Sequence, residues 1–268
     1  MVTFHHSILV VKNMLEIFIN DRQYGVPDET RLLDVCRDQQ IPIPTLCYHP
    51  ALPGFAGCRL CVVELRKETW SKLVTACEYP VFKAGERFYT DSDMVKQSRR
   101  MTAKLLLARA PEAKEALERI LGETITPEFE PLQAFNKKCV LCGLCYRICQ
   151  AQGTGAIYTM GRGADKVVET PYKEANADCI GCGSCAAACP TGAIVMRELP
   201  GKRAIWGYLF ELLPCPDCGK RHITDRMVAY IRAQSNMPEE EIRRCPECRQ
   251  KNITTGMLIG ISHEPLLS

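Results

Sequence analysis

The first third of the chain alternates short runs of β-branched and aromatic residues with polar turns, a pattern typical of strands. The runs predict strands over Leu15–Ile19, Cys61–Leu65, Leu73–Cys77 and Arg87–Thr90. Between the first two runs, Thr30–Gln40 places Leu32, Leu33 and Cys36 at helical spacing, which predicts a helix capped by Thr30 or Asp28. This order of strands, helix, loop and further strands predicts an α+β fold.

Helical periodicity dominates the next stretch, Asp93–Gly122, which Pro111 divides into two runs and which contains neither cysteine nor histidine. Residues 123–131 hold two prolines without periodicity and predict a linker. A later helix is predicted over Asp225–Ala233, with Thr224 as its cap. The apolar run Ile205–Leu213 is too short to span a bilayer, and core packing is favoured over a subunit contact.

The composition, with 46% hydrophobic and 24% charged residues, is that of an ordinary soluble protein. Met1–Val10 lacks the features of an export signal, so we expect a cytoplasmic location. A formal net charge of +3 is too small to indicate binding to nucleic acid. Arg99 and Arg100 are interpreted as solvated surface charges.

The 17 cysteines carry most of the chemical information. Disulfide frameworks belong to short secreted domains, whereas tight Cys-x-x-Cys pairs in a chain without an export signal favour metal binding. All but one of the cysteines fall into four sets with the spacing of metal ligands. The sequence therefore predicts an iron-sulfur protein.

The first set places three cysteines on one loop and a fourth on a later strand. Plant-type [2Fe-2S] ferredoxins use Cys-x4-Cys-x2-Cys with a distant fourth cysteine, and the spacing here is longer. Gly54 and Gly57 suit the bending of a loop around a cluster. The predicted ligands are Cys47, Cys58, Cys61 and Cys77.

The next two sets form an internal repeat of the pattern Cys-x2-Cys-x2-Cys-x3-Cys, which is that of bacterial ferredoxins with two clusters. In that pattern the fourth cysteine of each repeat binds the cluster of the other. One predicted [4Fe-4S] cluster is therefore held by Cys139, Cys142, Cys145 and Cys189. The second is held by Cys179, Cys182, Cys185 and Cys149. Three glycines between these ligands are expected to relieve crowding: Gly143, Gly181 and Gly183.

Two Cys-Pro-x-Cys knuckles make the last set, Cys215, Cys218, Cys245 and Cys248. They resemble zinc ribbons, in which four thiolates enclose a structural ion. Zinc is favoured, and a further [4Fe-4S] cluster on the same sulfurs stays open. His49 and His222 lie beside cysteine sets that are already complete, so packing roles are favoured for both.

The segment IPTLCYHPALPGFAGCRLCVVEL, followed by LVTACEYPV, resembles the N-terminal [2Fe-2S] domain of the large iron-sulfur subunit of complex I. The same domain occurs in NAD-linked hydrogenases, formate dehydrogenases and related bifurcating enzymes. The resemblance covers about Leu15 to Ser92 and implies a β-grasp domain in which the first cysteine set binds the cluster. Cys36 has no place in the motif and is expected to be a buried core thiol.

In that family a site of one histidine and three cysteines follows for another [4Fe-4S] cluster. Residues 93–122 contain neither residue type, so this cluster is predicted to be missing. The predicted domains are a [2Fe-2S] ferredoxin domain (1–92), a helical connector with linker (93–131), a two-[4Fe-4S] ferredoxin domain (132–199) and a zinc-ribbon-like domain (200–268).

Since no nucleotide fingerprint or catalytic constellation is visible, no catalytic residue is predicted. We expect an electron-transfer subunit of a multisubunit oxidoreductase. The resemblance implies a flavin- and NAD(P)-binding diaphorase partner and a catalytic subunit such as a hydrogenase, formate dehydrogenase or aldehyde oxidoreductase, and it is compatible with electron bifurcation. The alternatives are a free-standing diffusible ferredoxin and a redox-sensing regulator that binds nucleic acid. The near-neutral charge argues against the regulator.

Overall fold

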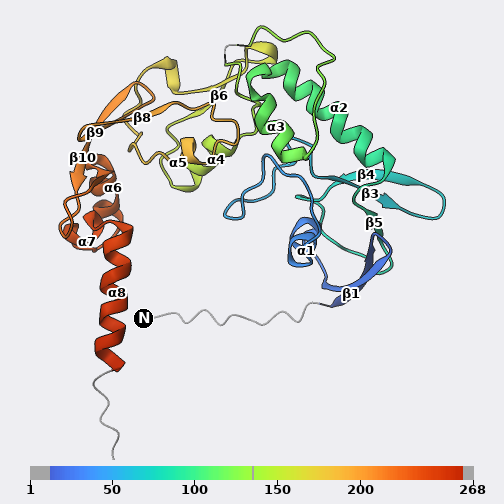
Figure 1. Ribbon diagram of the computed structural model, residues 1–268, viewed down its shortest axis with the longest axis horizontal. Helices are drawn as coiled ribbons and strands as arrows, with labels where there is room; N and C mark the ends of the chain where they lie inside the picture. The colour runs from blue at the N-terminus through green and yellow to red at the C-terminus, as the bar shows by residue number, and fades with distance from the viewer. Residues whose placement is uncertain (1–12, 135, 262–268) are drawn as a thin grey trace, which may run out of the picture. The chain divides into compact units, whose positions relative to one another are not determined.

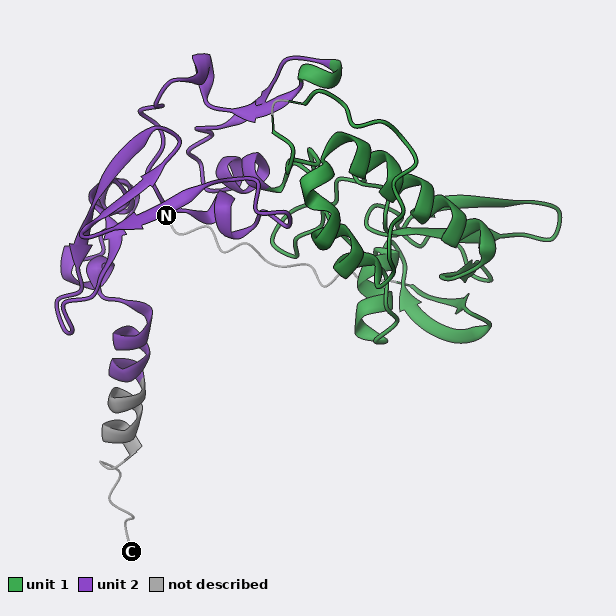
Figure 2. Ribbon diagram, turned by 45° about the horizontal axis from the view of Figure 1, so that its top comes forward, with its two compact units in different colours: residues 1–144, 163–165 green, residues 145–162, 166–268 purple. Residues whose placement is uncertain are grey.

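The computed structural model describes residues 13–134 and 136–261, with side chains up to residue 253. The expectation about export rests on Met1–Val10, which lies outside the described residues. The chain divides into two compact units (Figure 2). The first contains the residues up to 144 together with 163–165, and the second contains 145–162 and the residues from 166 onward.

The first unit is built on a five-stranded sheet in the order β2-β1-β5-β3-β4 (Figure 1). Its strands are β1 (Met14–Ile19), β2 (Arg22–Pro27), β3 (Val62–Arg66), β4 (Ser71–Thr75) and β5 (Arg87–Tyr89). Only the β1–β5 pair is parallel. The four predicted strands are confirmed, with β4 two residues earlier than expected. The predictions gave no residue range for β2, in which Gly25 and Pro27 weaken the strand signal.

Helix α1 (Leu32–Asp38) buries Leu32, Leu33 and Cys36 against this sheet, as predicted. The predicted cap is wrong, because the N-cap residue is Arg31 and makes no side-chain capping bond. Backbone carbonyls replace the side chain: the amides of Leu32 and Leu33 donate to the carbonyl oxygens of Tyr79 (2.8 Å) and Ala76 (3.0 Å). The start of the helix is thus tied to the segment that carries Cys77.

The connector is helical, as predicted, with α2 (Asp93–Arg109), the short η1 (Pro111–Ala113) and α3 (Lys114–Leu121). Ser92 caps α2 by accepting from the amide of Val95 (3.4 Å), and Gly122 ends α3 in the left-handed region. Arg100 pairs with Glu123 at the surface. Arg99 corrects the expectation of a solvated charge, because it is partly buried and its Nη2 donates to the carbonyl of Val62 (2.8 Å).

The second unit combines short helices with two small antiparallel sheets. Its first half holds most of α4 (Leu144–Ala151), the paired strands β6 (Tyr158–Met160) and β7 (Val167–Glu169), and α5 (Ser184–Ala187). A four-stranded sheet in the order β11-β10-β9-β8 follows. Its strands are β8 (Met196–Leu199), β9 (Lys202–Ile205), β10 (Tyr208–Pro214) and β11 (Arg221–Thr224).

The apolar run Ile205–Leu213 lies in the β9–β10 hairpin, and its packing role is confirmed. Ile205 and Phe210 are buried in one cluster with Cys145, Cys179 and Cys185. The intervening Leu209 is 53% exposed, as the alternation of a strand requires. This hairpin therefore forms part of the core around the second cysteine repeat.

The chain continues through α6 (Asp225–Gln234), α7 (Glu239–Arg243) and α8 (Pro246–Ile261). The predicted α6 is confirmed together with its cap, since Thr224 Oγ1 accepts from the amide of Met227 (3.1 Å). A small core of Ile223, Val228 and Ile242 holds β11, α6 and α7 together. Within the described ranges, every helix is too short or too polar to cross a bilayer.

Candidate metal centres

The first cysteine set lies on the loop before β3 and directly after β4. Cys47, Cys58, Cys61 and Cys77 are each at most 4% exposed. The amide of Cys58 donates to Cys47 Sγ (3.4 Å). Gly54 allows the loop to pass against the chain at Cys77, because a Cβ at this position would overlap the Cys77 carbonyl oxygen.

Hydrogen bonds stabilise thiolates in this set. The thiol of Cys47 lowers the pKa of Cys58, and that of Cys61 lowers the pKa of Cys77, while the pKa values of the two donors are raised. Backbone amides add to the effect, that of Leu60 at Cys58 and those of Ala56 and Phe55 at Cys77. Since the thiolate is the form that binds metal, Cys58 and Cys77 are the two members of the set that are prepared for ligation.

Three other residues named from the sequence have structural roles. Cys36 is fully buried in the sheet–helix core, and burial raises the pKa of its thiol to about 12. His49 Nδ1 accepts from the amide of Ala51 (3.2 Å), and Nε2 of His222 bonds the carbonyl of Arg243 (2.9 Å). Each imidazole thus uses a ring nitrogen to hold the local backbone.

The two cysteine repeats begin with the same turn, which the sequence predictions missed. The side chain of Asn136 accepts from the amides of Lys138 (2.9 Å) and Cys139 (3.2 Å). Forty residues later, Asn176 accepts from the amide of Asp178 (2.9 Å). The available signal was an asparagine three residues before the first cysteine of each repeat.

The repeats also share left-handed backbone within each Cys-x-x-Cys-Gly loop. Leu141 and Gly143 have φ values of 55° and 77°, and Gly181 and Gly183 have 68° and 78°. A Cβ at Gly181 would lie 2.7 Å from the ring of Phe210, and one at Gly183 would lie 2.7 Å from Met196 Sδ. A side chain at these two glycines would therefore collide with strands β10 and β8, while relief of crowding between the cysteines stays a prediction.

A Thr-Gly-Ala sequence follows the fourth cysteine of each repeat and was also missed. The amide of Ala156 donates to Cys149 Sγ and that of Ala193 to Cys189 Sγ, both at 3.2 Å. The hydroxyl of Thr154 lies 3.1 Å from Cys149 Sγ. Three additional residues after Cys149 hid the correspondence in the sequence.

In the second unit, four cysteines surround one largely apolar pocket: Cys149, Cys179, Cys182 and Cys185. Gln152 and Trp206 also line it. The side chain of Gln152 lies 3.2 Å from Cys182 Sγ, and the indole of Trp206 donates to Cys185 Sγ at 3.4 Å. This is the set that the sequence assigned to the second [4Fe-4S] cluster. Of the other set, Cys142 and Cys145 are buried, while Cys139 and Cys189 are half-buried.

Side chains from the C-terminal strands and from α6 hold the loop that carries Cys179 and Cys182. Arg203 donates to the carbonyl of Gly181 (2.8 Å), and Thr224 donates to that of Ile180 (2.5 Å). Arg226 donates to the carbonyl of Cys179 (3.3 Å) and stacks on the ring of Tyr208. This loop of the second cysteine repeat is therefore held in place by residues that follow it in sequence.

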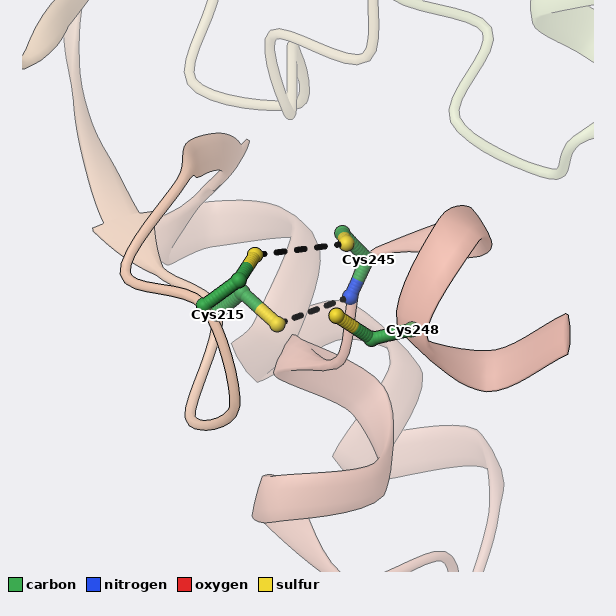
Figure 3. Close-up of side chains that lie close together, drawn as sticks. Cys215, Cys245 and Cys248 are labelled. Carbon is green, nitrogen blue, oxygen red and sulfur yellow. Dashed lines mark hydrogen bonds between the residues drawn. The ribbon is translucent and has the colours of Figure 1, made fainter. Parts of the chain in front are cut away.

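The last cysteine set converges on one point. The Sγ atoms of Cys215, Cys218, Cys245 and Cys248 all lie within 4.8 Å of one another, and the distance from Cys218 to Cys245 is 3.7 Å. Figure 3 shows the side chains of Cys215, Cys245 and Cys248 turned toward each other. Tetrahedral zinc with bonds of about 2.3 Å to sulfur requires sulfur atoms about 3.8 Å apart. The spacing fits a single ion.

Backbone and charged groups fix the two knuckles. The amide of Cys245 donates to Cys215 Sγ (3.3 Å), which joins one knuckle to the other. The Arg244 guanidinium pairs with Asp217 (2.6 Å) and lowers the pKa of that carboxyl group. The four sulfurs are thus held together by contacts of the protein itself.

Two known families of iron-sulfur domains match parts of the chain. Residues 12–86 match the family of 2Fe-2S iron-sulfur cluster binding domains. Residues 138–193 and 178–224 match the 4Fe-4S dicluster domain. The chain thus combines a [2Fe-2S] domain with a [4Fe-4S] dicluster domain, both of mixed α and β content.

Longer proteins show the same similarity. The chain is 31% identical over 236 residues to the NADP-reducing hydrogenase subunit HndD of Solidesulfovibrio fructosivorans, covering 76% of this chain and 39% of that protein. It is 26% identical over 230 residues to the NADPH-Fe(3+) oxidoreductase subunit alpha of Geobacter sulfurreducens, covering 76% of this chain and 27% of that protein. For a subunit of an NADH-quinone oxidoreductase of Rhizobium meliloti the identity is 27% over 232 residues, covering 77% of this chain and 27% of that protein.

Among solved structures, the crystal structure of NAD+-reducing [NiFe]-hydrogenase in the H2-reduced state matches with 26% identity and a TM-score of 0.48, covering 58% of this chain and 74% of that one. The chain spans between about a quarter and two fifths of the length of these curated relatives. The expected resemblance to iron-sulfur subunits of complex I and NAD(P)-linked hydrogenases is confirmed.

Proposed function

We propose that this relative of the iron-sulfur subunits of complex I and NAD(P)-linked hydrogenases relays single electrons within a multisubunit oxidoreductase. The observation that carries the proposal is the pocket of the second unit, which Cys149, Cys179, Cys182 and Cys185 line together. These residues come from two repeats separated by forty positions, and the crossed pattern of a two-cluster ferredoxin requires this combination.

The proposed cofactors are one [2Fe-2S] and two [4Fe-4S] clusters. The [2Fe-2S] cluster takes Cys47, Cys58, Cys61 and Cys77. One [4Fe-4S] cluster takes the pocket cysteines, and the other takes Cys139, Cys142, Cys145 and Cys189. Backbone amides that donate to the sulfurs of Cys149 and Cys189 support ligation by thiolates.

When bound, such clusters supply one-electron redox chemistry. The residues of this chain would do the rest: they bind the iron through thiolates, shield the sites from water and set each reduction potential through hydrogen bonds to sulfur. Each cysteine of the first set is at most 4% exposed, which supports this shielding. No acid, base or nucleophile is required of the chain.

The C-terminal cysteine set is proposed to hold structural zinc in a zinc-ribbon-like domain. The support is that its four sulfur atoms all lie within 4.8 Å of one another. In a [4Fe-4S] cluster each thiolate binds a different iron, so the ligand sulfurs lie farther apart than around one ion. Four protein ligands leave no open position, which is the arrangement of a structural site.

The proposed partners are a flavin- and NAD(P)-binding diaphorase subunit and a catalytic oxidoreductase subunit, in the cytoplasm. Support comes from the relatives, whose names include an NADP-reducing hydrogenase and an NADPH-Fe(3+) oxidoreductase. Of the domain boundaries proposed from the sequence, that at residue 199 falls inside a sheet, because β8 pairs with β9 across it.

The test is metal analysis of anaerobically purified protein, combined with EPR spectroscopy of the reduced sample. About ten iron and one zinc per chain, with signals of both cluster types, is the expected result. About fourteen iron without zinc would make the C-terminal cysteines a further redox site. Less than about two iron per chain after anaerobic reconstitution would contradict the relay.

A pull-down from the native source tests the partners. The expected result is co-purification with a flavoprotein that oxidises or reduces NAD(P) and reduces the clusters in the presence of nicotinamide. Isolation of the chain alone, in a form that exchanges electrons freely with several unrelated enzymes, would favour the diffusible ferredoxin.

A further inference from the structure

The turn between β9 and β10 has an unusual residue in a strained position. Tyr208 pairs with Ile205, so the loop consists of Trp206 and Gly207 alone. Their φ values are 53° and 77°, the positive pair of a type I′ turn. Asparagine or glycine is preferred at the first position, and a bulky side chain there is an outlier that calls for a compensating role.

The side chain of Trp206 provides that role. Its indole Nε1 donates to Cys185 Sγ at 3.4 Å, and the ring packs with Ile205 and Phe210 against the cysteine-lined pocket. Cys185 itself is only 7% exposed. A hydrogen bond to a buried sulfur is not weakened by competition from water.

We propose that the strained Trp206–Gly207 turn places the indole N–H as a fixed hydrogen-bond donor to Cys185, which raises the reduction potential of the [4Fe-4S] cluster in the second unit. The inference rests on the proposed function, because it assumes that Cys185 is a cluster ligand.

The sign follows from charge. Reduction adds one electron to a cluster whose thiolates are already anionic. A donor aimed at a ligand sulfur stabilises this added charge, so it favours the reduced state and raises the potential. The loss of the donor therefore lowers the potential of this cluster and leaves the [2Fe-2S] cluster unchanged.

The test compares Trp206→Phe with Trp70→Phe in the full chain, followed by EPR-monitored redox titration. The two tryptophans of this protein make a matched pair, since Trp70 is 45% exposed and lies in the first unit beside Lys67 and Lys72. For Trp206→Phe we expect about a tenfold fall in the equilibrium constant for reduction of one [4Fe-4S] cluster, which is about 59 mV for a one-electron couple. Trp70→Phe should leave all potentials in place.

A second variant separates tuning from folding. Trp206→Asn supplies a residue preferred in this turn and removes the indole donor. Relief of the backbone strain should offset part of the lost ring packing, so we expect a small change in Tm while the potential falls as in Trp206→Phe. A purely structural role for Trp206 would not lower the potential in a variant of comparable stability.

Two outcomes overturn the inference: an unchanged potential in a fully loaded Trp206→Phe protein, or an equal shift in Trp70→Phe. Both differ from failure of the proposed function, in which the wild-type protein itself would bind no [4Fe-4S] cluster. If Trp206→Phe loses iron, Trp206→Asn provides the same comparison.

Discussion

At the scale of single residues, two arginines that are adjacent in sequence lie in different environments. Arg99 and Arg100 follow each other on α2, yet Arg100 pairs with Glu123 at the surface while Arg99 reaches the carbonyl of Val62, next to Cys61. The Nε of Arg99 is without a hydrogen-bond partner in the described part of the chain. The pKa of this guanidinium is lowered, because the effect of burial is larger than the opposing effect of the negative charge of Cys61.

This difference predicts a redox effect of Arg99. Arg99→Gln removes a partly buried positive charge beside the first cysteine set, so it should lower the reduction potential of the [2Fe-2S] cluster. Arg100→Gln is the matched control and should change the potential little, because its exposed ion pair is screened by water. EPR redox titration of both proteins checks this, and equal shifts in the two variants would exclude the local effect.

The buried thiol of Cys36 predicts a dependence of stability on pH. Its pKa is about 12 in the folded chain and 9.0 unperturbed, so the unfolded chain ionises first as the pH rises. The stability that the neutral thiol contributes is complete below pH 9.0 and is lost as the pH approaches 12, by about 1.4 kcal/mol per unit.

Cys36→Ala removes this contribution and should retain the iron of the first unit. In chemical unfolding, we expect its deficit in unfolding free energy relative to wild type to shrink between pH 8.5 and 10.5, on the order of 1–2 kcal/mol. A constant deficit over that range would mean that the thiol is not protected from ionisation in the fold.

At the scale of elements, the glycines near the cysteines of the second repeat differ in what surrounds them. Gly181 and Gly192 both have positive φ, 68° and 64°. A Cβ at Gly181 would meet the ring of Phe210, whereas one at Gly192 would have no atom within 4 Å apart from those of Gly192 itself and its two chain neighbours. Replacement by alanine costs about 1–2 kcal/mol of backbone strain at either site, with about 1–3 kcal/mol more from overpacking at Gly181 alone.

Thermal unfolding and iron analysis distinguish the two changes. Gly181→Ala should lower the Tm more than Gly192→Ala and should lose about four iron, since β10 would have to move away from the pocket. A similar fall in Tm with full iron in both variants would show that β10 adapts at little cost.

The sequence could predict the features of the fold and the site that depend on local patterns. Spacing named the cysteine sets, and periodicity found β1, β3, β5, α1, α2 and α6, because ligand number and amphipathic patterns are local properties. The N-cap of α1 was missed because the backbone carbonyls of Ala76 and Tyr79 satisfy its first amides. The donors to sulfur were missed for a similar reason: a backbone amide such as that of Ala156 has no side-chain signature.

At the scale of the whole molecule, the C-terminal segment contributes to the site that precedes it. Arg226 on α6 bonds the carbonyls of Ala177 and Cys179, while Arg232 on the same helix forms an exposed pair with Glu239. Arg226→Ala should therefore increase the rate at which chelators or air release iron from the second unit, several-fold relative to Arg232→Ala. Loss of the visible absorption of the clusters with time measures this rate, and equal rates would indicate that the loop is held without Arg226.

Removal of the proposed zinc ion tests the same coupling from the C-terminal knuckles. In the sequence, Thr224 and Arg226 lie between the two knuckles. His222 bonds the carbonyl of Arg243, two residues before Cys245. A zinc-specific chelator should destabilise the contacts of the knuckles with β11 and α6. We therefore expect faster hydrogen exchange in β11 and α6 and then in residues 177–182. Exchange confined to the knuckles would contradict the coupling.

The dependence of an earlier loop on later residues also concerns the order of events during synthesis. The second cysteine repeat leaves the ribosome while Arg203, Thr224 and Arg226 are still untranslated or inside the exit tunnel. Its ligands are then present without the strands and helix that hold them in place. Delivery of a cluster to this site is therefore expected to follow emergence of residues 203–226 from the ribosome, so a maturation factor would act on a polypeptide in which β9, β11 and α6 have already folded.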